Sequence, residues 1–194
     1  MAERQIGETL IEVISDKSVL ENAINRASEF ENKLAKLDVS ARFEQLEKIR
    51  DAFIESESVF MQILGIEAGK PQWDAQDEFK AALTVFDRVL AMREDFTKAL
   101  LFGYEKLNGA CNYSNYPIGV VTAVMPFSTP LISFASIFSS SMLSGCPLVL
   151  CPSSHAVFSG ILLSLLAEKV ELPAGALNVV FGDFETFKKV IPNK

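Results

Sequence analysis

The spacing of apolar residues changes near the middle of this 194-residue chain. In the first half, apolar side chains recur at steps of three and four, which is the period of an α-helix with one buried face. Such runs fill residues 17–36, the stretch from Phe43 to Phe53, the stretch around Phe60, and a long run from Phe79 to Leu90. The first half is therefore predicted to form four amphipathic helices.

Residues between these runs indicate where the helices begin and end. Asp16 is a candidate cap for the first helix and Asp74 for the fourth, because a short polar side chain can accept a bond from a free N–H of the first turn. The third run ends at Gly69 and Pro71, where glycine allows a left-handed turn and proline cannot continue a helix. We expect the acidic residues nearby to form a solvated face; they are Glu67, Asp74, Asp77 and Glu78.

The apolar runs become shorter from residue 103 onward. Asn108-Gly109 favours a type I′ hairpin turn and predicts a β-ribbon over 104–116. After Pro117 the pattern alternates, with strands expected at 119–125, 147–151 and 177–181 and helices at 131–144 and 156–169. Short apolar strands joined by helices indicate a parallel sheet with right-handed crossovers. The predicted fold class is α/β: N-terminal helices, a β-ribbon and a three-stranded parallel open sheet.

Composition excludes several classes of protein. Hydrophobic residues make up 49% and charged residues 22%, which is ordinary for a globular chain. The net charge is −7 and no basic run occurs, which argues against a nucleic-acid partner. Three cysteines form no C-x-x-C pair and His155 is the single histidine, so no metal site is predicted.

No membrane partner is expected either. Prolines divide the apolar stretch 116–150, and its longest helical piece, 131–144, falls short of the roughly 20 residues that a bilayer requires. The amino terminus has no apolar segment of the kind found in secretory signals, and the cysteine count is odd. We therefore expect a cytoplasmic protein.

Four sequence blocks carry a family resemblance. They are Glu67-Ala-Gly-Lys-Pro71, the run from Tyr116 to Leu131, the run from Ser144 to Ser153, and the run from Leu172 to Gly182. In this order they resemble the N-terminal part of the aldehyde dehydrogenase superfamily. The resemblance implies a helical lead-in followed by the first half of a Rossmann-like NAD(P)-binding domain. The glutamate base and cysteine nucleophile of that family would lie beyond Lys194.

The resemblance also implies an organisation and an assembly. We treat 1–194 as a single partial aldehyde dehydrogenase-like unit, with a helical layer over 1–102, a ribbon over 103–117 and half of the dinucleotide-binding domain over 118–194. The ribbon resembles the oligomerisation arm of the family. An incomplete parallel sheet also leaves a strand edge unpaired, and such an edge can pair with another chain. We expect a homo-oligomer, or association with a complementary chain.

One candidate site loop follows the first strand. In the family this loop reads Pro-Trp-Asn-Phe-Pro; its backbone lines the nicotinamide, and its Asn donates to the oxyanion of the reaction. Here Pro126 and Phe127 stand in the cofactor-facing part, and Ser128 takes the place of the Asn. The resemblance makes Ser128 the candidate catalytic residue. The alternative is a turn whose serine bonds to nearby backbone groups.

The other candidate positions follow the second and third strands. Cys151 and Ser154 stand where the family has the Lys and Glu that hold the adenosine ribose, and Gly182 stands where its chain turns near the adenine. A neutral thiol cannot replace an ammonium group, so NAD or NADP binding is expected to be weak or absent. The alternatives are a small apolar role for Cys151 and a simple strand-to-helix turn at Gly182. His155 has no acidic or cysteine neighbour and is interpreted as a surface or capping residue.

Three functional hypotheses follow. The chain is part of an active NAD(P)-dependent aldehyde oxidoreductase, or a truncated non-catalytic homologue that acts as a binding module, or one half of a split enzyme. The replacements at Ser128 and Cys151 favour the second hypothesis over the first. In each case the chain by itself is predicted to be inactive.

Overall fold

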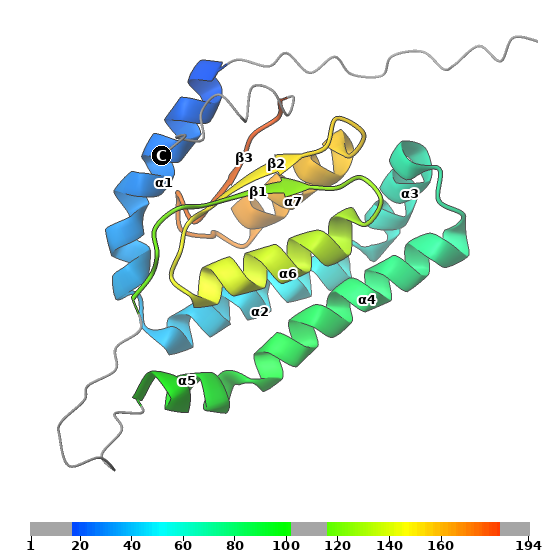
Figure 1. The fold of residues 1–194 in the computed structure, drawn as a ribbon. Coiled ribbons are helices and arrows are strands. Elements are labelled where there is room, and N and C mark those ends of the chain that lie inside the picture. The colour runs from blue at the N-terminus through cyan, green and yellow to red at the C-terminus, as the bar shows by residue number, and fades with distance from the viewer. Residues whose placement is uncertain (1–16, 102–115, 183–194) are drawn as a thin grey trace, which may run out of the picture.

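A computed structural model describes residues 17–101 and 116–182 of the chain. The helices are α1 (Lys17–Lys36), α2 (Val39–Glu55), α3 (Glu57–Ala68), α4 (Gln72–Ala91), α5 (Arg93–Leu101), α6 (Pro130–Leu143) and α7 (Val157–Lys169). The strands are β1 (Val121–Met125), β2 (Leu148–Pro152) and β3 (Leu177–Val179). The helices surround a small sheet, as Figure 1 shows. None of the described helices is both long and apolar enough to cross a membrane.

The predicted α/β fold with a parallel open sheet is confirmed. The strand order is β1-β2-β3, and both neighbouring pairs are parallel. The register places Val121 opposite Leu148 and Leu148 opposite Leu177. All five residues of β2 are buried, as expected for a central strand covered on both faces. The third strand ends at Val179, two residues earlier than the pattern had predicted.

The helix boundaries confirm one expectation and correct another. Gly69 ends α3 in the left-handed conformation, with φ of 63°, as predicted for a glycine after a helix. Asp74 is not the cap of α4, which begins earlier, at Gln72. The N-cap residue is Pro71, whose carbonyl accepts the first backbone hydrogen bonds of the helix, from the N–H groups of Asp74 and Ala75. Asp16 and the predicted ribbon before Tyr116 lie outside the described residues.

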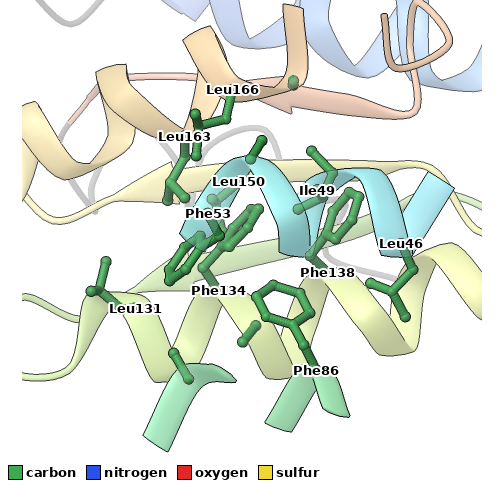
Figure 2. Close-up of a cluster of buried hydrophobic side chains, with 14 of the residues drawn as sticks. Leu46, Ile49, Phe53, Phe86, Leu131, Phe134, Phe138, Leu150, Leu163 and Leu166 are labelled. Carbon is green, nitrogen blue, oxygen red and sulfur yellow. The ribbon is translucent and has the colours of Figure 1, made fainter. Parts of the chain in front are cut away.

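The main core is a cluster of phenylalanines centred on Phe53 of α2. Its ring centroid lies 4.4 Å from that of Phe60 on α3 and 5.3 Å from that of Phe79 on α4. It also stacks on Phe134 of α6 at 6.4 Å, and Figure 2 shows both rings in the cluster below β2. One set of rings therefore joins the N-terminal helices to the first crossover helix.

The two faces of the sheet are covered by different helices. Leu148 and Leu150 of β2 belong to the main core with α6 and α7, whereas Val149 and Cys151 pack with Leu20, Ala23 and Ala27 of α1. Alternate residues of a strand point to opposite faces, so α1 covers the face opposite the crossover helices. Each face of β2 is thereby removed from water.

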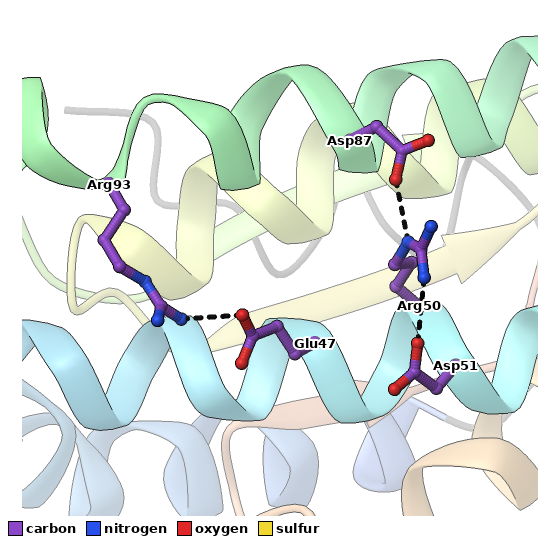
Figure 3. A network of polar contacts seen from close by, with 5 residues as sticks. All are labelled: Glu47, Arg50, Asp51, Asp87 and Arg93. Carbon is purple, nitrogen blue, oxygen red and sulfur yellow. Dashed lines mark hydrogen bonds and ion pairs between the residues drawn. The ribbon is translucent and has the colours of Figure 1, made fainter.

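Charged side chains join the helices at the surface. Arg50 of α2 donates from Nε to Asp87 of α4 at 2.8 Å, and Arg93 of α5 pairs with Glu47 of α2 at 2.9 Å (Figure 3). The bond to Asp87, and a second one to Asp51, raise the pKa of the Arg50 guanidinium. Exposed pairs of this kind contribute at most about 1 kcal/mol each, so the aromatic core dominates the stability of this layer.

A buried arginine connects α1, α2 and α6. The guanidinium of Arg42 donates to the carbonyls of Ala35, Leu37 and Leu143 at 2.9 to 3.0 Å. Burial lowers the pKa of Arg42, and the nearby Cys146 and Asp38 oppose that shift. The three carbonyls belong to residues near helix ends, where such groups lack partners within the helix.

We predict that Phe53→Ala is severely destabilising, because the truncated side chain would leave a cavity among four neighbouring rings. The loss in the free energy of unfolding should be about 3–5 kcal/mol. Urea unfolding followed by circular dichroism measures it. Phe127→Ala is the matched control, since Phe127 is 51% exposed, and its effect should stay below about 1 kcal/mol. Equal effects of the two variants would contradict the central position of Phe53.

Candidate functional site

The loops at the carboxyl ends of the strands carry most of the predicted site residues. Pro126 follows β1, Ser154 follows β2, and Gly182 follows β3. The first two loops are joined where the N–H of Ser153 donates to the carbonyl of Met125 at 2.9 Å. The crevice outside the carboxyl ends of the strands is where open α/β sheets bind ligands.

Two exposed aromatic side chains meet at this edge. The rings of Phe127 and His155 have centroids 5.6 Å apart, and Nδ1 of His155 lies 3.3 Å from Oγ of Ser154. His155 is exposed and precedes α7, in agreement with the surface role expected for it, although the capping residue is Ala156. Ser128 is also exposed, in the loop before α6. The structure therefore brings Phe127, Ser154 and His155 together.

Cys151 lies beneath this edge and not on it. Its side chain is 3% exposed, and its Sγ is 3.9 Å from the carbonyl oxygen of Gly182. Apolar side chains of α1 and the sheet surround it, among them Ala27, Val149 and Val180. These are the surroundings of a small buried apolar residue.

Glu67 corrects the expectation of a solvated acidic face. Its carboxylate accepts hydrogen bonds from the N–H of Phe158, from the N–H of Ser159 at 3.0 Å, and from Oγ of Ser159 at 2.7 Å. Phe158 and Ser159 lie in the first turn of α7, where N–H groups lack partners within the helix. A carboxylate there also interacts favourably with the helix dipole. Glu67 therefore holds the start of α7 to the end of α3.

Glu78 has a similar role at the other crossover helix. It is 4% exposed and accepts a hydrogen bond from the N–H of Leu131, in the first turn of α6, at 2.8 Å. Its second oxygen lies 2.5 Å from Nζ of Lys70, whose charge compensates the buried carboxylate. Of the four acidic residues, Asp77 is the one found exposed; Asp74 is partly covered, and its carboxylate lies 3.8 Å from Nζ of Lys70.

The sequence carries a signal for the burial of Glu78. Glu78 stands three residues after Ala75 and four before Ala82, both of which are fully buried, so it belongs to the buried stripe of α4. For Glu67 the signal is its place at the start of the block Glu67-Ala-Gly-Lys-Pro71, one of the four blocks that carry the family resemblance. Both glutamates position loops that carry candidate site residues, because each binds the helix that follows such a loop.

A metal site requires several ligating side chains close together. Within residues 17–101 and 116–182, no group of three or more His, Cys, Asp or Glu side chains is arranged to hold a metal ion. The candidate site therefore consists of the loop residues at the carboxyl edge.

A parallel open sheet with crossover helices and loops gathered at its carboxyl edge defines the chain as an α/β protein. Comparison with known proteins gives the particular family. The model of the "Aldehyde dehydrogenase family" matches residues 5–194. The chain belongs to the aldehyde dehydrogenase family, and the resemblance of its four sequence blocks is confirmed.

Curated relatives are distant and much longer than this chain. The chain is 28% identical over 178 residues to 3,6-anhydro-alpha-L-galactose dehydrogenase of Streptomyces coelicolor, covering 91% of this chain and 36% of that protein. It is 27% identical over 172 residues to lactaldehyde dehydrogenase of Methanococcus maripaludis, covering 87% and 36%. The chain thus spans little more than a third of these relatives.

Solved structures share the fold. An oxidoreductase from Marinobacter aquaeolei superposes with a TM-score of 0.85 at 25% identity, covering 97% of this chain and 40% of that one. An aldehyde dehydrogenase from Bartonella henselae gives a TM-score of 0.74 at 22% identity, covering 84% and 34%. The helical layer and the sheet together therefore match part of larger structures.

We predict that Glu67→Ala loosens the start of α7. The change leaves three donors without their shared acceptor, which should lower the free energy of unfolding by about 1–3 kcal/mol. Glu44→Ala, at an exposed position of α2, is the matched control and should change it by no more than about 0.5 kcal/mol. Hydrogen exchange should show loss of protection at Phe158 and Ser159. Unchanged protection at those two amides would argue against the capping role.

Proposed function

We propose that this chain forms the cofactor side of an NAD(P)-dependent aldehyde oxidoreductase and does not oxidise aldehydes by itself. The observation that carries the proposal is the gathering of the loops with Pro126, Ser154 and Gly182 at the carboxyl edge of the sheet. Family membership supports the choice of chemistry. We treat residues 1–194 as one unit, which the shared core of α2, α4 and α6 supports.

Within this proposal, the site residues divide between the nicotinamide side and the adenosine side of the cofactor. Pro126 and Phe127 face the nicotinamide side of the cofactor, and Ser128 stands where the family donates to the oxyanion. Cys151, Ser154 and Gly182 lie on the adenosine side. If a dinucleotide binds, it supplies the hydride acceptor; the chain itself contributes the loops that orient it.

Binding of NAD or NADP by this chain should be feeble. The adenosine side offers a buried thiol at Cys151 and an uncharged hydroxyl at Ser154. Hydrogen bonds to charged groups contribute about 1.5–3 kcal/mol each, which neither of these neutral groups supplies. These observations also favour the second candidate function, a non-catalytic module of the family.

Assembly and location are parts of the same proposal. We propose that the chain works as a homo-oligomer or beside a complementary chain that supplies the remaining parts of the family fold. A cytoplasmic location is proposed from the odd number of cysteines, which does not suit a framework of paired disulfides. No nucleic-acid partner is proposed, because of the acidic composition.

We predict that isothermal titration with NAD and NADP detects no micromolar binding to the purified chain. The variant Cys151→Lys should bind NAD or NADP about tenfold or more tightly, because lysine supplies the charged hydrogen-bond donor that the family has on the adenosine side. The aliphatic part of the new lysine side chain can lie along the strand toward its carboxyl end. In the wild type the Sγ atom of Cys151 lies 3.9 Å from the carbonyl oxygen of Gly182 at that end. Leu165→Lys on α7, where Leu165 is 53% exposed, adds the same charge elsewhere and should have no effect. Micromolar affinity in the wild type would overturn the prediction.

We further predict that the chain shows no aldehyde oxidation above background. The reaction requires a thiolate that attacks the carbonyl, a base and a bound nicotinamide. The described cysteines, Cys146 and Cys151, are buried, so neither presents a thiol to His155, which is exposed beside Phe127. Absorbance of the reduced nicotinamide, with short, aromatic and semialdehyde substrates, is the assay. Turnover that disappears in Cys146→Ser or Cys151→Ser would contradict the prediction.

A further inference from the structure

His155 is the one side chain on the loops after β1 and β2 that can carry a positive charge. Residues 107–167 contain no Asp, Glu, Lys or Arg, and the chain has a single histidine. An imidazole gains its proton as the pH falls from about 8 to about 5. These two loops therefore change from uncharged to cationic over that range.

Contacts from both loops hold the ring of His155 at the carboxyl edge. Its centroid lies 5.6 Å from that of Phe127, in the loop after β1, and its Nδ1 lies 3.3 Å from Oγ of Ser154. Its backbone N–H donates to Oγ of Ser153 at 3.3 Å, and the N–H of Ser153 donates to the carbonyl of Met125. His155 is exposed and Nδ1 is the ring atom bonded to the protein, which leaves Nε2 for a ligand.

Other groups that commonly bind phosphate near this edge already have partners. Amides at the start of a helix are a frequent phosphate site, but here Glu67 binds amides in the first turn of α7 and Glu78 binds one in the first turn of α6. Lys70 pairs with Glu78 at 2.5 Å. These three are the titratable side chains that the described contacts place against the starts of the two crossover helices, and all three are engaged within the protein. An anion at the edge is left with the imidazole of His155.

The chemistry of this position suits a phosphate group on a nucleotide. A phosphate monoester carries up to two negative charges and accepts hydrogen bonds from N–H and O–H groups. Both nitrogens of a protonated imidazole are donors, so Nδ1 can donate to the Ser154 hydroxyl while Nε2 donates to the phosphate. The Ser154 hydroxyl can then donate its own hydrogen to the same group. NADP carries such a phosphate on its adenosine ribose, and NAD does not.

We propose that His155 is a proton-controlled specificity residue. In its protonated form, and together with Ser154, it binds the ribose phosphate of NADP, so NADP is favoured over NAD at mildly acidic pH and the two bind nearly alike at pH of about 8. This inference rests on the proposed cofactor role of the carboxyl edge, and both affinities stay weaker than micromolar. Proton and phosphate binding are coupled, so each strengthens the other by the same factor.

Proton NMR of the full chain tests this coupling directly, because the ring protons of a single histidine give one unambiguous titration. NADP in millimolar excess should move the midpoint of that titration to higher pH, whereas NAD at the same concentration should not. The amides of Phe127, Ser154 and Gly182 report binding in the same samples. They should show NADP affinity rising about fourfold from about pH 8 to about pH 6.5, with NAD affinity unchanged.

Variants of His155 separate the imidazole from the phosphate itself, which gains a proton near a pH of about 6. His155→Gln keeps a polar side chain without the charge and should abolish the preference for NADP. His155→Arg carries the charge at every pH and should prefer NADP at both pH values. Leu165→His places an imidazole on α7, where Leu165 is 53% exposed, and as the matched control it should bind both nucleotides as the wild type does. Circular dichroism verifies that each variant is folded.

Equal binding of NAD and NADP at both pH values, seen at the amides of the three loops, would overturn the inference and leave the proposed cofactor role standing. A preference for NADP that persists in folded His155→Gln would also contradict it, because another group would then be the source. If neither nucleotide shifts any of these amides at millimolar concentration, the inference and the cofactor role fail together.

Discussion

The stacking of phenylalanine rings around Phe53 is the constraint on which the rest of the structure depends. Phe60 and Phe79 contact this ring from the N-terminal helices, and Phe134 contacts it from α6. Aromatic side chains bury large areas and prefer defined relative orientations, so the cluster sets how the helical layer lies against the crossover helix. Because α6 begins directly after the loop with Ser128, the same packing determines where the candidate site stands.

Two glutamates fix the positions of the loops relative to this core. Glu67 binds the first turn of α7 and Glu78 the first turn of α6, so both crossover helices are held by side chains of the helical layer. In many α/β proteins the start of such a helix binds a phosphate. Here protein carboxylates already bind these amides, and Lys70 compensates one of them. An incoming dinucleotide would have to find its phosphate partners elsewhere, in keeping with the weak binding proposed.

The elements of the fold could be predicted from sequence better than the contacts between them. Short apolar runs bounded by glycine and proline identify the three strands, and Gly69 correctly marks the end of α3. The prediction that Glu67 and Glu78 belong to a solvated face was wrong because their partners are far away in the sequence. Leu131 lies 53 residues from Glu78, and Ser159 lies 92 residues from Glu67. Helical periodicity identifies a buried face without identifying what covers it. Cys151 was expected at the end of the second strand and lies in β2, but its burial beneath α1 depends on tertiary packing.

The central claim is that the helical layer and the sheet form one cooperative structure that holds the loops at the carboxyl edge. Native-state hydrogen exchange of the amides in α2, α4 and β2, followed as denaturant is added, tests this claim most directly. If the claim holds, the most protected amides of all three elements exchange with the same free energy of opening and the same denaturant dependence. Protection of β2 that persists under conditions where α2 and α4 have already opened would contradict it.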